Sequence, residues 1–281
     1  MALGGNLAPG KAKPLDLRSA YRLRDQLIAE YQNTAKRIAT MAAEDAANDR
    51  VGTAAYRSKR LAVIQAELSA LQDLTIPGAT SLISNAYAAG ATQTADHLGI
   101  APPDFGATIH AEAVTVLADN ITSDLNAAAE TVGRRVADAY RREGLAASQR
   151  MLLEGETRRA ASQAMSKSLL REGLTSFIDK GGRSWNLDSY TKMVLRTTTS
   201  EAATQGVIND LAENGLDLVE IAVADPCEIC KPYEGNTYSL TGGDPEYEPL
   251  DDQPPFHPNC ECTLTASTAN LARLTAGATN A

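Results

Sequence analysis

Residues 225–230 read DPCEIC and residues 254–262 read PPFHPNCEC. Prolines beside both segments predict two tight turns that face each other. Zn²⁺ prefers four tetrahedral sulfur or nitrogen ligands, and a C-x-x-C turn supplies two of them, so the pattern predicts a structural zinc site. The candidate ligands are every cysteine of the chain and one of its three histidines: Cys227, Cys230, His257, Cys260 and Cys262.

Five candidates compete for four coordination positions, so one of them is spare or orients its neighbours. The His-x-x-Cys spacing mirrors Cys-x-x-Cys, which favours a ligand set of Cys227, Cys230, His257 and Cys260, with Cys262 in reserve. A four-cysteine site would instead leave His257 outside the coordination sphere. The connection between the two turns is rich in glycine and proline, so we expect a loop there rather than paired strands, closed by the metal.

Three other interpretations of the cysteines compete with a metal site. Disulfides are disfavoured because nothing at the N-terminus resembles a signal peptide, so we expect the chain to mature in a reducing cytoplasm. Four buried thiols could act as small hydrophobic side chains, although chance rarely gathers all of them in one segment. A redox pair would need a βαβ context, which the sequence does not indicate.

The composition favours a helical protein. Hydrophobic residues make up 43% of the 281 residues, which is enough for a core, while aromatic residues are only 5% and alanine is abundant. No apolar run reaches the length of a membrane span. Residues 201–281 hold two Lys or Arg against fourteen Asp or Glu, a net charge of −12. This acidic part should repel nucleic acid, and it is either a solvated surface or a face for a basic partner.

The hydrophobic periodicity predicts a mainly α fold, with long N-terminal helices followed by a small α+β C-terminal module. The expected parts are a flexible arm (1–14), a helical hairpin resembling a coiled coil (15–100), a second helical region (101–174), the α+β module (175–263) and a flexible tail (264–281).

Local signals place the ends of these elements. Residues 76–78, Ile-Pro-Gly, should end one helix, and Gly144 another. The alternating segment 216–223 is the strongest strand in the chain. We expect Asp188 or Ser189 to cap the helix before this strand. Two aromatic side chains should belong to the core of the module: Trp185 and Tyr190.

Motifs in the C-terminal half form an ordered series. They include GGRSW (181–185), the Tyr190, Met193, Arg196 series, and the two cysteine-containing turns. Over about residues 155–263 this series resembles phage minor head proteins of the Mu F-like and minor capsid protein 2 type. Such proteins often carry a basic residue between the last two cysteines, where this chain has Glu261.

The resemblance implies a non-enzymatic, low-copy structural protein of a tailed phage. Such a protein lies in the virion, at the portal vertex or inside the head, and passes through the host cytoplasm during assembly. It would act in capsid assembly, DNA packaging or DNA delivery. Expected partners are the portal protein, the major capsid protein or both. The amphipathic N-terminal helices also suit self-association.

Two other functions compete with a capsid role. His110 and Glu112 with Cys227 and Cys230 match the H-x-E…P-C-x-x-C signature of zinc deaminases, but 116 residues separate the two halves, and this interpretation leaves the second cysteine-containing turn unused. A DNA-binding head protein would require salt-dependent binding by residues 1–175. The arginines there have acidic neighbours, which favours a plain solvated face. Within the module, Arg196 could pair with an acidic residue such as Asp225.

Overall fold

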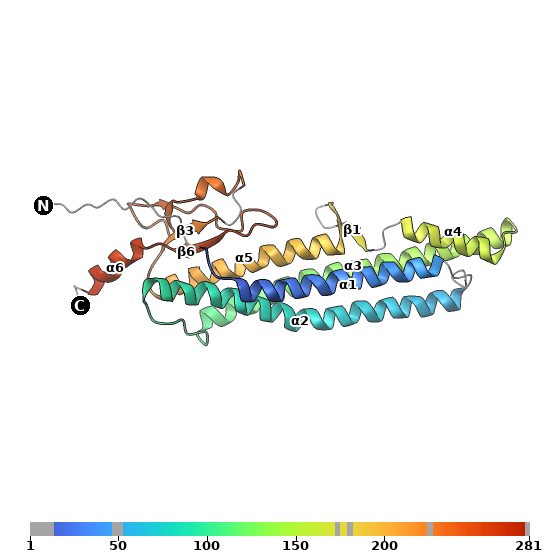
Figure 1. Cartoon of the computed structure of the whole chain (residues 1–281), viewed down its shortest axis with the longest axis horizontal. Coiled ribbons are helices and arrows are strands. Elements are labelled where there is room, and N and C mark those ends of the chain that lie inside the picture. Colours follow the sequence, from blue (N-terminus) through green and yellow to red (C-terminus); the bar gives the residue numbers. More distant parts are fainter. Residues whose placement is uncertain (1–13, 47–52, 172–174, 179–181, 224–226, 279–281) are drawn as a thin grey trace. The chain divides into compact units, whose positions relative to one another are not determined.

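The computed structural model describes residues 14–46, 53–171, 175–178, 182–223 and 227–278 (Figure 1). The helices are α1 (Arg18–Ala46), α2 (Ala54–Leu98), α3 (Thr108–Leu153), α4 (Arg158–Arg171), α5 (Leu187–Glu213) and α6 (Ala269–Ala278). The strands are β1 (Ser176–Ile178), β2 (Ser184–Asn186), β3 (Leu218–Ala222), β4 (Thr237–Ser239), β5 (Glu248–Pro249) and β6 (Thr263–Ala266), with a 3-10 turn at Lys231–Tyr233. Long helices therefore precede a small α+β module, which confirms the predicted fold class.

The chain divides into two compact units, which are described separately. The helical unit comprises Asp25–Gly78 and Thr122–Lys192. The sheet unit comprises the described parts of Met1–Arg24, Ala79–Ile121 and Met193–Ala281. None of the helices within the described ranges is long and apolar enough to cross a membrane.

The helical unit is built on the apolar seams that the sequence predicts. Tyr31 and Ile38 of α1 are fully buried, and Ile64 and Leu68 of α2 have exposed fractions of only 2% and 4%. The Tyr31 hydroxyl lies 2.8 Å from the Thr75 hydroxyl, so its polar end is satisfied inside the core. Each side chain of this seam removes apolar surface from water, which stabilises the packed helices.

A buried carboxylate that no local sequence pattern indicates joins four helices of this unit. Asp45 of α1 has no exposed surface and accepts hydrogen bonds from the Tyr56 hydroxyl (2.6 Å), Arg60 Nε (2.9 Å) and the Tyr140 hydroxyl (2.7 Å). Its carbonyl oxygen accepts another from Ser166 of α4 at 2.9 Å. A buried charge is tolerated when it is paired and hydrogen-bonded in this way.

The sheet unit holds a four-stranded sheet of order β5-β4-β3-β6. The central strand β3 runs antiparallel to β4 and β6, with Val219 opposite Tyr238 on one side and Ala266 on the other. The adjacent pair β3 and β6 is labelled in Figure 1. Val207 and Leu211 of α5 belong to the same buried cluster as the strand residues. The predicted strand at 216–223 is therefore confirmed as β3.

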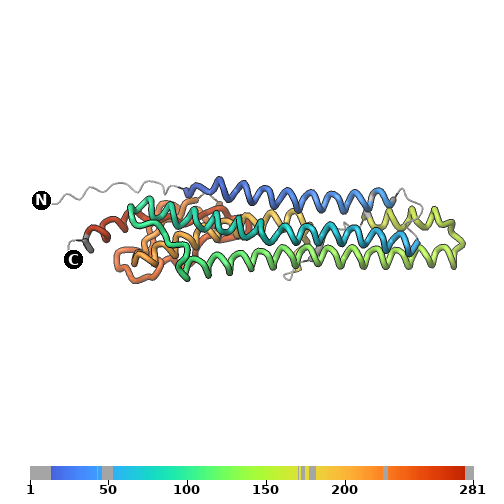
Figure 2. The backbone as a smooth tube through the Cα atoms, turned by 90° about the horizontal axis from the view of Figure 1, so that it is seen from below, coloured from blue at the N-terminus to red at the C-terminus, as the bar shows by residue number. Residues whose placement is uncertain are grey.

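Two glycines allow α2 and α5 to touch within the sheet unit. A Cβ atom at Gly90 would fall on the carbonyl oxygen of Ala203, and one at Gly206 would fall on the carbonyl oxygen of Tyr87. Only glycine permits such an approach of two backbones. Figure 2 follows the backbone from α2 through residues 99–107, where the chain reverses direction into α3, as the prolines at 102 and 103 suggest.

Two predicted helix ends are wrong. Pro77 lies inside α2, which continues to Leu98, and Gly144 lies inside α3, which continues to Leu153. The helix is packed beside both positions: Gly78, the neighbour of Pro77, faces Leu27, where an added Cβ would lie 3.3 Å from Cγ, and a Cβ at Gly144 would meet the Arg57 guanidinium. Tertiary contacts thus override the local preference for a break.

The start of α5 also differs from the prediction. The Asn186 side chain accepts a hydrogen bond from the Ser189 amide at 2.8 Å, so Asn186 caps the helix, rather than Asp188 or Ser189. Trp185 and Tyr190 pack edge to face, with ring centroids 5.9 Å apart. Both are only half-buried, so they are not core residues as predicted.

The described part of the segment expected to be a flexible tail, residues 264–278, contains most of β6 and all of α6, and the rest of that segment lies outside the described residues. The Asn270 side chain donates to the carbonyl oxygen of Leu218 at 2.7 Å, and Arg273 donates to Asp217 at 2.6 Å. The composition of this segment, which is rich in Ala, Thr and Asn, does not predict these long-range contacts. The expected loop between the cysteine-containing turns likewise contains two short strands, β4 and β5. The predicted arm, apart from its last residue, lies outside the described residues.

Candidate metal centre

Two turns of the sheet unit present the candidate ligands. In the first, the Lys231 amide donates to the Cys227 carbonyl at 2.9 Å, and the Cys230 amide points at the Cys227 sulfur at 3.4 Å. In the second, the Cys260 amide donates to the His257 carbonyl at 3.0 Å, with Asn259 at a positive φ of 64°. Asparagine is one of the few residues that adopts this conformation readily.

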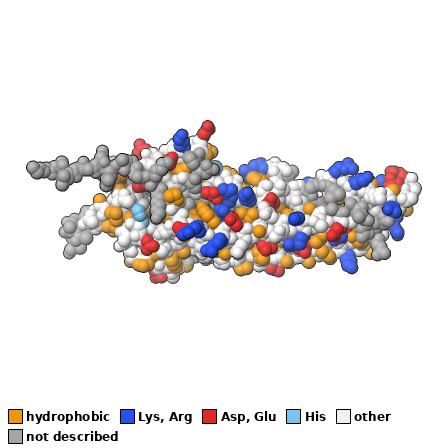
Figure 3. Space-filling model, viewed as in Figure 1, with side chains coloured by type: hydrophobic (Ala, Val, Ile, Leu, Met, Phe, Trp, Pro, Cys, Tyr) orange, Lys and Arg blue, Asp and Glu red, His pale blue; other side chains and the backbone are white. Residues whose placement is uncertain are grey.

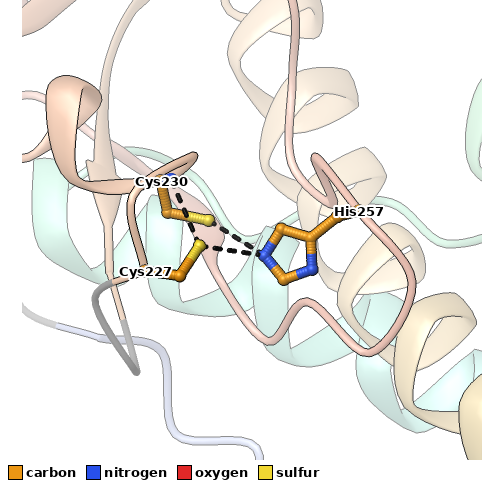
Figure 4. A group of neighbouring side chains, drawn as sticks. All are labelled: Cys227, Cys230 and His257. Carbon is orange, nitrogen blue, oxygen red and sulfur yellow. Dashed lines mark hydrogen bonds between the residues drawn. The ribbon is translucent and has the colours of Figure 1, made fainter.

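The two turns bring an imidazole and two sulfurs together (Figure 4). Nε2 of His257 lies 3.3 Å from Sγ of Cys227 and 3.3 Å from Sγ of Cys230. Sγ of Cys230 lies 3.8 Å from Sγ of Cys260. Zinc bonds of about 2.3 Å to sulfur and about 2.0–2.1 Å to nitrogen give tetrahedral edges of roughly 3.8 Å between sulfurs and roughly 3.6 Å from sulfur to nitrogen. The observed separations therefore fit a zinc tetrahedron.

All five predicted ligands lie at this place, as two triplets that share Cys230. One triplet is Cys227, Cys230 and His257, and the other is Cys230, Cys260 and Cys262; within each, the ligand atoms lie within 4.8 Å of one another. The 3.8 Å separation favours Cys260 as the fourth ligand, next to Cys227, Cys230 and His257. Cys262 then adjoins the site as a neighbour of both Cys230 and Cys260.

The competing interpretations fit the geometry less well. All four cysteines are free thiols, and 3.8 Å is far beyond the roughly 2.05 Å of a disulfide bond. Cys230, Cys260 and Cys262 are buried in the same apolar cluster as Leu264, as small hydrophobic side chains would be. Burial alone does not account for the His257 ring nitrogen directed at two sulfurs, whereas a metal ligand set does.

The hydrogen bonds of His257 prepare it as a ligand. Nδ1 lies 3.0 Å from the Pro258 carbonyl oxygen, so this nitrogen carries the proton and Nε2 offers its lone pair toward the sulfurs. The bond to Pro258 is also the main reason why the pKa of His257 lies above its usual range. Metal ligands commonly gain their orientation and basicity from such a backbone partner.

The thiols are not equivalent. Hydrogen bonding from Cys262 lowers the pKa of Cys260 to about 5, and the Cys230 amide lowers the pKa of Cys227. Burial raises the pKa of Cys230 to about 12. A divalent cation among them would deprotonate each coordinating thiol, because the thiolate is the form that binds metal.

Glu261, between the last two cysteines, ties this turn to two helices. Its Oε1 accepts a hydrogen bond from Arg24 of α1 at 2.6 Å, and its Oε2 accepts one from Arg196 of α5 at 2.7 Å. The suggested partner Asp225 lies outside the described residues, and the observed partner of Arg196 is Glu261. The Ser200 hydroxyl adds a hydrogen bond to the Cys262 carbonyl.

The deaminase-like pattern is not assembled. His110 is 1% exposed, with Nδ1 at 2.7 Å from the Tyr87 hydroxyl and Nε2 at 2.9 Å from the Glu213 carboxylate. Both ring nitrogens are thus engaged, so neither is available to hold zinc with Cys227 and Cys230. Within the described ranges, His110 belongs to no group of converging ligand atoms.

Comparison with family models shows the family of this chain. A family model described as phage minor capsid protein 2 matches residues 23–261. The match covers most of the helices as well as both cysteine-containing turns, and so extends well beyond the segment from about 155 to 263 where the sequence motifs lie. No curated protein and no solved structure matches the chain.

Proposed function

Because this chain belongs to the phage minor capsid protein 2 family, we propose that it is a structural component of a tailed-phage head, located at the portal vertex or on the inner side of the head. The observation that carries the proposal is the extent of the match, which spans 23–261. A match that covers both the helices and the module supports a virion role for the whole chain more directly than a match to the small module alone would.

In this role the protein binds the portal protein, the major capsid protein or both, during capsid assembly and DNA packaging or delivery. The charge distribution supports protein partners rather than DNA for the acidic C-terminal part, because residues 201–281 carry a net −12. It acts without catalysis: the histidine–cysteine centre is largely buried, with Cys230 and Cys260 at 1% exposure or less. The Mu F-like resemblance stays a prediction.

The metal in this proposal is structural zinc. Cys227, Cys230, His257 and Cys260 hold it, and Cys262 supports the sulfurs of Cys230 and Cys260. When bound, zinc contributes its binding free energy to the folding of the module. Elemental analysis of purified protein should find about one zinc per chain, and Cys230→Ala should lose it. If wild-type protein that was never exposed to chelator contains no zinc, the proposal of a structural zinc site is wrong, whereas the proposed capsid role is unaffected.

The capsid role is tested in the phage. Mass spectrometry of purified virions should detect the protein, and cross-linking in isolated heads should join it to portal or major capsid subunits. Deletion of its gene should yield defective or unfilled heads, and supply of the protein in trans should restore infectivity. A protein absent from virions, with normal particles after deletion, would overturn the proposal.

A further inference from the structure

Three leucines form an exposed apolar patch in the helical unit. Leu152 and Leu153, at the end of α3, are 83% and 82% exposed, and Leu145 is 62% exposed. Leu145 and Leu152 are seven residues apart, so they lie on the same face of the helix. These leucines, called the leucine patch below, are the most exposed large hydrophobic side chains in the described part of the chain.

Basic residues outnumber acidic ones in the segment that carries the leucine patch. Residues 134–171 hold nine Lys or Arg against four Asp or Glu, a net charge of +5. Arg158 and Arg159, in the first turn of α4, are both exposed, as is Arg142 on α3. Figure 3 shows several Lys and Arg side chains, with some Asp and Glu among them, around the region where α3 is followed by α4. Two acidic residues, Glu154 and Glu156, also lie beside the leucines, and Glu156 pairs with Arg150. An exposed apolar patch in a segment with an excess of one charge is typical of an interaction surface.

A second exposed apolar set lies in the sheet unit, with the opposite charge around it. Phe105, Ile109 and Val116 are exposed by 40% or more, and Ile109 and Val116 share one face of α3. Residues 79–121 contain no Lys or Arg. Three exposed carboxylates accompany the apolar residues and complete what is called the acidic stripe: Asp104, Glu112 and Asp119.

We propose that the leucine patch of one copy docks on the acidic stripe of a second copy of this chain. The two surfaces match in kind, since each holds exposed apolar side chains, and in charge, since basic residues are in excess in the segment of one and only acidic residues accompany the other. Such a contact is heterologous, because it joins different surfaces of the two copies, and it repeats into a chain or closes into a ring. The proposal goes beyond the capsid role, which requires contacts with other head proteins but none between copies.

Sedimentation velocity of the purified full chain tests the docking. The average mass of the sedimenting species should increase with protein concentration. A rise in NaCl from about 0.05 M to about 0.5 M should weaken the association, because salt screens the charged residues of the two surfaces. Leu152→Asp with Leu153→Asp should weaken it at least about a hundredfold, because two nearly full leucine side chains lose their burial. Val116→Asp should also weaken it. Val63→Asp, at an exposed position of α2 outside both surfaces, should not.

Mixing separates this contact from a symmetric one. The Leu152→Asp, Leu153→Asp variant keeps its acidic stripe, and the Val116→Asp variant keeps its leucine patch. Each alone should stay monomeric, while an equimolar mixture should form a one-to-one complex that grows no further. A wild-type chain that is monomeric at every concentration would overturn the proposal. So would a Val116→Asp variant that associates normally, because the leucine patches would then pair with each other. Circular dichroism of each variant excludes unfolding as the cause.

Discussion

Arg196 donates a hydrogen bond of 2.7 Å to Glu261, although 65 residues separate them in the chain. The other carboxylate oxygen of Glu261 accepts from Arg24 at 2.6 Å, so one carboxylate balances two guanidinium groups. All three side chains are largely buried, at 12% to 31% exposure. Since Glu261 lies between Cys260 and Cys262, this bridge orients the turn that carries the candidate ligands.

Replacement of Glu261 by Gln should lower the free energy of unfolding by about 1–3 kcal/mol, because two partly buried arginines lose the charge that balances them. Urea unfolding of the full chain measures the change. Glu246→Gln provides the matched control: Glu246 is exposed, and its replacement should change stability by less than about 0.5 kcal/mol. Equal effects of the two substitutions would show that the bridge contributes nothing.

Serine substitutions distinguish the ligand from the spare cysteine. Cys260→Ser should reduce the zinc content well below one per chain, whereas Cys262→Ser should leave the content unchanged and at most weaken affinity, as changes beside the ligands do. Elemental analysis with a chromogenic chelator titration measures both quantities. The reverse outcome would assign Cys262 to the metal, and retention of zinc by both variants would point to His257 with the first turn alone.

Asp45 should be among the most sensitive positions of the helical unit. Asp45→Ala leaves Arg60 and the hydroxyls of Tyr56 and Tyr140 without their acceptor, and should cost about 3–5 kcal/mol. Asp138→Ala is the control, since Asp138 pairs with Arg141 at an exposed site, where such pairs contribute about 0–1 kcal/mol. Thermal unfolding of the two variants measures the difference. A similar loss in both would contradict the importance of the buried network.

Asp210 of α5 should make stability depend on pH. Both of its carboxylate oxygens are buried without a hydrogen-bond partner among the described residues, and burial raises its pKa from 3.8 to about 6. As pH rises from about 4 to 6, the unfolded chain releases this proton before the folded protein does, so stability falls and stays lower above the folded pKa.

The variant Asp210→Asn removes this titration. It should therefore be more stable than wild type by about 1–3 kcal/mol at pH 7, and the difference should vanish below pH of about 4. Urea unfolding at several pH values measures it. A gain that is independent of pH would assign the effect to packing rather than to charge.

The sequence predicted what depends on local pattern. The seam through Tyr31 and Ile38, and the strand that became β3, follow from hydrophobic periodicity. The five candidate ligands followed from residue type and spacing, and the turns do bring them together. A candidate site whose ligands all come from two short segments can be predicted without knowledge of the rest of the fold.

Contacts between segments that are distant in the chain could not be predicted from the sequence. Nothing local to Glu261 indicates its partners, which lie 237 and 65 residues away. The strand β6 and the helix α6 are held in place because β6 pairs with β3 and Arg273 donates to Asp217. The local composition indicates neither contact. The predicted helix end at Pro77 was wrong for the same reason, because a helix that is held by packing tolerates a residue that would end it in isolation.

The contact of α2 with α5 constrains how the family can diverge. The absent side chains of Gly90 and Gly206 face carbonyl groups of Ala203 and Tyr87, which every amino acid carries. A larger residue at one position therefore cannot be offset by a smaller one at the other. Relatives that keep this crossing should conserve each glycine independently, without covariation between the two, and those that lose one must have moved the helices apart.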